Sequence, residues 1–94
     1  MHRILWEAVE LPYYLLLSRS ITHAQRMQIV LGKKGISCRI LRPPVGLTDK
    51  GCSYAIRVAE KNYSEALYFL REENILPMRI FLVAEDGAFR EVYL

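Results

Sequence analysis

Residues 11–41 read LPYYLLLSRSITHAQRMQIVLGKKGISCRIL and decide the fold, because they encode a strand, a helix and a second strand in succession. Residues 13–17 form a short, wholly apolar run followed by serines, which predicts a central strand covered on both faces. Ser20 then caps a helix whose apolar residues recur at three- and four-residue spacing until a glycine ends it. Residues 37–41 alternate in polarity and stop at two prolines, which predicts a second strand.

The second half of the chain repeats this order of elements. From residue 52 to residue 58 the side chains alternate between two faces, Cys52, Tyr54, Ile56 and Val58 on one, and Ser53, Ala55 and Arg57 on the other. Asn62 with Glu65 resembles a capping box, which predicts a second helix that ends near Asn74. Residues 79–84 predict a fourth strand, and EDGA at residues 85–88 predicts a hairpin into residues 89–93.

The element order is therefore βαββαβ with a further C-terminal strand. This order predicts an α+β fold of the ferredoxin-like sandwich type, with an antiparallel sheet, two helices on one face and the strand order 4-1-3-2. A chain of 94 residues predicts a single domain over residues 1–94. We divide it into an N-terminal extension (1–10), a core (11–76) and a C-terminal hairpin (77–94).

The composition is that of a soluble globular domain, with 52% hydrophobic and 24% charged residues. No apolar stretch approaches the roughly 20 residues of a membrane span. Glu7 and Glu10 interrupt the N-terminal segment where a signal peptide would be apolar, so we expect a cytoplasmic protein without a membrane partner. The net charge of +3 leaves weak nucleic-acid binding open, although such an excess is common on ordinary surfaces.

The predicted topology gives Cys52 specific neighbours. The first helix starts and the third strand begins at the same end of the sheet, so the thiol is expected near the N–H groups that follow Ser20 and near Arg42. Helix N-termini and cations stabilise a thiolate, and Arg19, His23, Arg42 and Lys50 are the candidate cations. Cys52 is also in phase with Tyr54 and Ile56, so the alternative is a buried cysteine that only packs in the core.

A bridge between Cys38 and Cys52 conflicts with the predicted hairpin. The two cysteines lie four residues apart along the ladder, roughly 13 Å, whereas bridged Cα atoms lie within about 7 Å. Two free thiols are also the expectation for a chain without an export signal. We therefore predict that Cys38 packs in the core.

Other sites have little support in the sequence. His2 and His23 are the two histidines and no CxxC spacing occurs, so no metal site is predicted. No nucleotide motif is present, and we expect no cofactor. The open sheet face is predicted to carry Tyr14, Leu16, Arg39, Leu41, Ala55, Arg57, Phe81 and Val83. That set lacks the stacking aromatics of RNA-binding RRM domains, so nucleic acid is not the expected partner. A homodimer or a covering hairpin is expected on this face instead.

Residues 11–75 resemble a family of small bacterial domains known as Se/S carrier-like proteins. The resemblance rests on the Tyr-Tyr apolar strand, the serine-rich helix start, the Lys/Gly-rich helix end, the proline-terminated strand and the cysteine before an apolar strand. The Gly-Cys-Gly step of that family falls on Gly51, Cys52 and Ser53, so a serine stands where the family has its second glycine. A side chain there narrows the approach of another backbone to the thiol.

The resemblance implies a carrier that holds sulfur or selenium on Cys52 as a persulfide or selenosulfide. The resemblance places Gly51 and Ser53 beside this cysteine, and the predicted topology adds Ser20, His23 and Arg42 as supporting residues. The resemblance also implies donor and acceptor proteins as partners in a sulfur relay. Such a protein is a carrier or binding protein rather than a stand-alone enzyme. Two alternatives remain: a regulatory or interaction module that uses the sheet face and Trp6, and weak RNA binding.

Overall fold

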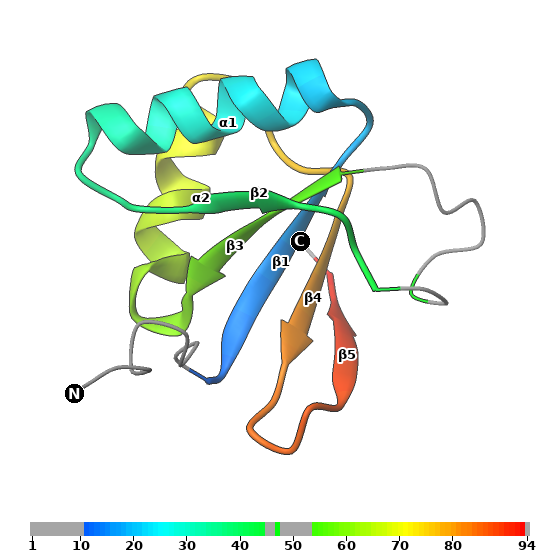
Figure 1. Ribbon diagram of the computed structural model, residues 1–94. Coiled ribbons are helices and arrows are strands. Elements are labelled where there is room, and N and C mark those ends of the chain that lie inside the picture. The colour runs from blue at the N-terminus through cyan, green and yellow to red at the C-terminus, as the bar shows by residue number, and fades with distance from the viewer. Residues whose placement is uncertain (1–10, 45–46, 48–53, 94) are drawn as a thin grey trace, which may run out of the picture.

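The computed structural model describes residues 11–44, 47 and 54–93, and within them the chain forms one antiparallel sheet and two α-helices (Figure 1). A 3-10 turn over Glu60–Asn62 precedes the second helix. The other elements are β1 (Tyr13–Ser18), α1 (Ile21–Lys33), β2 (Arg39–Leu41), β3 (Tyr54–Ala59), α2 (Tyr63–Glu72), β4 (Arg79–Val83) and β5 (Phe89–Val92). The predicted α+β class and antiparallel sheet are confirmed.

The strand order is β2-β3-β1-β4-β5, so β3 lies between β2 and β1 as predicted, and β5 extends the sheet beyond β4. β1 is central, and its Leu16 lies opposite Ile56 of β3 and Ile80 of β4. All three side chains are fully buried. The apolar run over residues 13–17 of β1 thus reflects a strand that has neighbours on both sides and a packed core above it.

Both helices cover one face of the sheet, which the sequence predicted. In α1 the buried residues are Ala24, Met27 and Leu31, and in α2 they are Ala66 and Leu70. These side chains form a single cluster with Leu16, Ile56, Val58 and Ile80 of the sheet. Three- and four-residue spacing places the apolar residues of each helix on one stripe, and burial of that stripe holds the helix on the sheet.

The opposite face differs in part from the prediction. Tyr14 and Leu16 were predicted on this face, but their side chains point to the helices. Tyr13, Leu15 and Leu17 lie on this face instead. The other predicted members hold their positions, and Ala55, Phe81 and Val83 pack there with Leu41. Residues 13–17 are all apolar, so the sequence carries no alternation that could distinguish the two faces.

This second face is largely buried even though both helices lie on the other side. Leu15 and Ala55 are 1% and 0% exposed, and Leu47 of the β2–β3 connection packs against the same cluster. The guanidinium of Arg57 lies over the ring of Tyr13, and that of Arg79 lies over Phe81. The aromatic rings on this face are therefore partly covered by arginine side chains.

Two local predictions were wrong. β2 begins at Arg39 rather than at residue 37, and the carbonyl of Cys38 accepts a hydrogen bond from the side chain of Gln28 in α1. Asn62 makes no side-chain capping bond, because it ends the 3-10 turn with a helical backbone (φ −102°, ψ −1°) instead of the extended backbone of a cap. In the described part of the chain, both helices are too short and too polar to cross a membrane.

Candidate functional site

Three elements meet at the end of the sheet where the candidate cysteine was predicted, and Ser18 joins them. Ser18 is the last residue of β1 and its side chain is fully buried. Its Oγ lies 2.9 Å from the carbonyl oxygen of Ser20, at the start of α1, and 2.9 Å from that of Tyr54, at the start of β3. One hydroxyl therefore holds the beginning of β3 beside the N-terminus of α1.

The start of α1 is organised as the sequence predicted. Ser20 has an extended backbone, and its Oγ accepts a hydrogen bond from the backbone N–H of His23 at 3.1 Å. The backbone N–H of Arg19 donates to Nδ1 of His23, also at 3.1 Å. Ser20 and His23, both predicted site residues, therefore lie together at this end of the sheet.

The role predicted for His23 as a cation does not fit its surroundings. Partial burial lowers the pKa of this imidazole below its ordinary value, and the charges of Arg19 and Arg26 lower it further. A hydrogen bond with the backbone of Leu76 raises the pKa, but by less than the other causes lower it. Its Nδ1 is also occupied as an acceptor, which requires that nitrogen to be unprotonated. His23 is consequently neutral near pH 7 and supports the helix start instead of supplying charge.

Arg42 is brought to the start of β3 by Tyr54. The guanidinium lies 4.8 Å from the centre of the Tyr54 ring, and its Nη2 donates to the Tyr54 hydroxyl at 3.2 Å. Tyr54 packs against the helix-side core, while Arg42 itself is exposed. A cation is thus held at the point where the described part of β3 begins, in agreement with the expected place of Arg42.

The remaining predicted site residues, Gly51, Cys52 and Ser53, lie outside the described residues, as does Lys50. The structure therefore brings Ser20, His23 and Arg42 to one end of the sheet around Ser18 and Tyr54, and the placement of Cys52 stays a prediction. Ser18 and Tyr54 were missed as site residues. The signals that point to them are a serine that ends a buried apolar strand and a tyrosine two residues after the cysteine.

Cys38 has the environment of a packing residue. It is half-buried against the helix-side core and forms no disulfide. Burial raises the pKa of its thiol to about 11, so the thiol is almost entirely protonated near pH 7. Because the thiolate is the reactive form, Cys38 is predicted to be inert, in line with its predicted role in the core.

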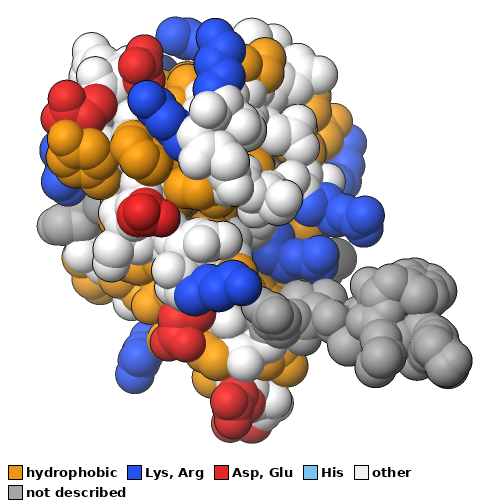
Figure 2. Space-filling view, turned by 90° about the vertical axis from the view of Figure 1, so that its left-hand side faces the viewer, with side chains coloured by type: hydrophobic (Ala, Val, Ile, Leu, Met, Phe, Trp, Pro, Cys, Tyr) orange, Lys and Arg blue, Asp and Glu red, His pale blue; other side chains and the backbone are white. Residues whose placement is uncertain are grey.

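The described residues contain no group of three or more His, Cys, Asp and Glu side chains placed to hold a metal ion. On the face displayed in Figure 2, Lys and Arg side chains are interspersed with acidic and apolar ones. Among the described residues on that face, the Lys and Arg side chains form no continuous stripe of the kind that follows a nucleic-acid backbone.

The class of protein that these features define is a small α+β domain with two helices on one face of an antiparallel sheet. Comparison with family models gives a match over residues 13–82 to the family described as "Putative Se/S carrier protein-like". The match spans most of the chain, and the protein belongs to this family. No curated protein and no solved structure matches the chain.

Proposed function

We propose that this protein carries sulfur or selenium transiently on Cys52, as a persulfide or a selenosulfide. The observation that carries the proposal is the attachment of β3 to the α1 N-terminus through Ser18, with Arg42 beside it. Ser53 alone separates Cys52 from Tyr54 in the sequence, so covalent geometry allows at most about 7 Å between the Cα atoms of Cys52 and Tyr54. Membership of the Se/S carrier-like family supports the same assignment.

The proposed chemistry needs Cys52 as a thiolate. The N–H groups at the start of α1 and the charge of Arg42 both favour an anion in their vicinity, and so lower the pKa expected for a nearby thiol. The thiolate attacks the outer sulfur of a donor persulfide, R–S–SH. The donor S–S bond breaks as the new Cys52 S–S bond forms, and R–S⁻ leaves with the electron pair, so no external oxidant or reductant is needed.

A carrier also needs its cargo to survive until the acceptor arrives. A second reactive thiol within reach would attack the persulfide and release the sulfur with formation of a disulfide. Cys38 is half-buried with a pKa of about 11, so it is a poor nucleophile near neutral pH. The described surroundings of Cys38 therefore support a single working thiol.

The proposal also covers the partners, the compartment, the fold type and the quaternary state of the protein. Donor and acceptor proteins are the proposed partners, the cytoplasm is the proposed compartment, and no bound cofactor is invoked. We classify the fold as a ferredoxin-like sandwich extended by β5, on the basis of the observed order of its first four strands. A homodimer through the sheet face opposite the helices, where Phe89 of β5 is exposed, is proposed for the quaternary state, with light scattering as its test.

Loading the protein with a sulfur donor tests the proposal. Purified, reduced protein is incubated anaerobically with glutathione persulfide, freed of small molecules and weighed intact. We expect the wild type and Cys38→Ser to gain the mass of one sulfur atom, and Cys52→Ser to gain none. No gain on the wild type, or an equal gain on Cys52→Ser, would refute carriage on Cys52.

A further inference from the structure

β5 is the last strand of the sheet, and its outer edge pairs with no other strand in the described part of the chain (Figure 1). The N–H of Ala84 donates to the carbonyl of Ala88 at 2.9 Å, which fixes the alternation of hydrogen bonds between β4 and β5. By that alternation the N–H and C=O groups of Phe89 and Glu91 point away from β4, as do those of Tyr93, the next residue in phase. Such a row of unpaired backbone groups is a template for another strand.

The same residues of the edge share one sheet face. Phe89 lies opposite Val83 and Glu91 opposite Phe81, and both of these β4 residues belong to the cluster on the face opposite the helices. Tyr93 follows in the same phase. Phe89 is 44% exposed and Tyr93 is 80% exposed. Two exposed aromatic side chains therefore flank Glu91, in an order that is the same in both chain directions.

The charge of Glu91 is compensated within its own chain. Charged side chains on an edge strand often oppose pairing with another strand. The guanidinium of Arg79, however, donates two hydrogen bonds to the carboxylate of Glu91, at 3.0 and 2.8 Å. A second copy that brings its own Glu91 to this place therefore meets an ion pair and not an isolated carboxylate.

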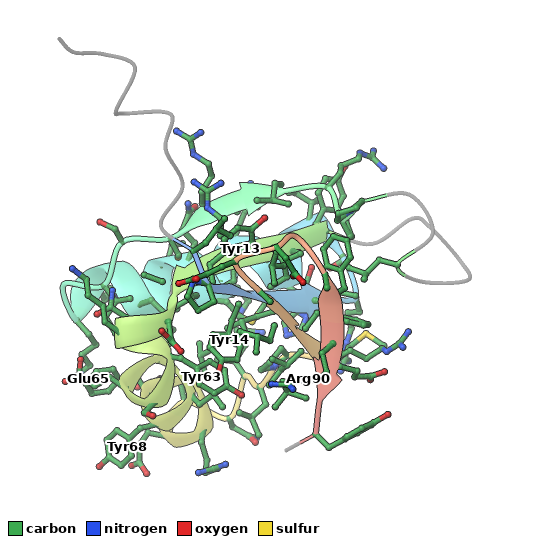
Figure 3. The ribbon with its side chains drawn as sticks, turned by 90° about the horizontal axis from the view of Figure 1, so that it is seen from below. Tyr13, Tyr14, Tyr63, Glu65, Tyr68 and Arg90 are labelled. Atoms are coloured by element: carbon green, nitrogen blue, oxygen red, sulfur yellow. The ribbon has the colours of Figure 1, made fainter. Side chains whose placement is uncertain are left out.

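The charge of Arg90 disfavours one way of pairing two copies of β5. A one-residue slip exchanges the two faces of a strand, so the faces of both copies match only in alternate registers. A register centred on Arg90 sets two Arg90 side chains directly opposite each other, which is destabilising. Figure 3 shows Arg90 on the side of the sheet that bears Tyr14 and Tyr63, and within the described residues it forms no ion pair.

The register centred on Glu91 matches the side chains of the edge. It sets Phe89 opposite Tyr93 of the second copy at both ends, and aromatic pairs in this position stabilise the pairing of strands. The outward N–H and C=O groups of these residues and of Glu91 then meet as hydrogen-bonded pairs. On the other face, Arg90 lies opposite the apolar Val92.

We propose that β5 pairs antiparallel with β5 of a second copy of the chain, about a twofold axis at Glu91, so that the two sheets continue into one. The same residues of both copies form this interface, as a twofold dimer requires. The inference rests on the homodimer proposed above and specifies the contact that forms it. It uses none of the residues around Cys52 and is independent of sulfur carriage.

Light scattering of the full chain after size-exclusion chromatography, over a range of concentrations, tests this pairing. We expect the wild type to be a dimer. Phe89→Glu/Tyr93→Glu sets like charges opposite each other and should raise the dissociation constant of the dimer at least about tenfold. Phe89→Lys/Tyr93→Glu differs only at residue 89, sets a lysine opposite a glutamate of the second copy, and should restore the dimer. Tyr68→Glu, at a 56% exposed position of α2, is the control and should leave it unchanged.

A wild type that is monomeric at every concentration would overturn both the homodimer and the β5 pairing. A dimer that persists in Phe89→Glu/Tyr93→Glu would overturn the β5 pairing alone, and equal weakening of both double variants would overturn the register. Circular dichroism verifies that each variant is folded. Tyr93→Pro is a second disruptive variant, because it removes an outward N–H beyond the last residue of β5, and an undiminished dimer would again refute the pairing.

Discussion

Replacement of Ser18 by alanine is the most informative stability test, because this one hydroxyl links β1, α1 and β3. The side chain is 0% exposed, and its Oγ lies 2.9 Å from two carbonyl oxygens. The carbonyl of Ser20 keeps a second partner, the backbone N–H of Ala24 at 3.0 Å, so the substitution does not leave it unsatisfied. We therefore expect a loss near the value of one buried hydrogen bond, about 1 to 2 kcal/mol of unfolding free energy.

For a domain of this size, each kcal/mol corresponds to a fall of roughly 4–8 °C in the melting temperature. Far-UV circular dichroism during urea and thermal unfolding measures both quantities. Ser37→Ala is the matched control, because Ser37 is exposed and lies outside the helices and strands, and it is expected to change stability by less than about 0.5 kcal/mol. A Ser18→Ala protein as stable as this control would refute the inference that the hydroxyl holds these elements together.

Three further substitutions test the core, the pH response and the site. Leu16→Ala, at a fully buried position, is expected to cost about 2 to 5 kcal/mol in urea unfolding. The exposed Ile29→Ala should cost less than about 1 kcal/mol, and equal losses would contradict the assigned core. Since the folded pKa of His23 lies below 6.5, the native state binds fewer protons than the unfolded state, and stability should fall as the pH drops through 6.5. His23→Gln should reduce that fall, measured as the urea midpoint at about pH 7.5 and 5.5, and an unchanged fall would assign it to other groups. Arg42→Gln should raise the pKa of the Cys52 thiol in pH-dependent alkylation, and an unchanged value would remove Arg42 from the site.

Local sequence signals predicted much of the fold. Ser20 caps α1 because a serine before an apolar helical stripe satisfies a free N–H group, a bond that depends only on neighbouring residues. The alternation that begins β3 also placed Ile56 and Ala55 on their correct faces. From these elements and general rules of connection, the antiparallel sheet and the shared face of both helices followed.

Features that depend on tertiary packing were not predictable in the same way. The faces of Tyr14 and Leu16 were predicted the wrong way round, because residues 13–17 are all apolar and show no alternation that would indicate their orientation. The cap predicted at Asn62 fails, because a 3-10 turn over Glu60–Asn62 connects β3 directly to α2. The linking role of Ser18 was not predicted, because it depends on contact with β3, which lies far along the chain.

The pKa of the Cys52 thiol tests the central claim most directly. The two cysteines of the wild-type protein are alkylated over a range of pH, and mass spectrometry of the peptides gives a separate titration for each thiol. Cys38 is an internal reference, with a pKa of about 11 expected from its burial. The account predicts that the pKa of Cys52 lies clearly below the unperturbed value of about 8.5. A value at or above about 8.5 would contradict it and would indicate a packing cysteine.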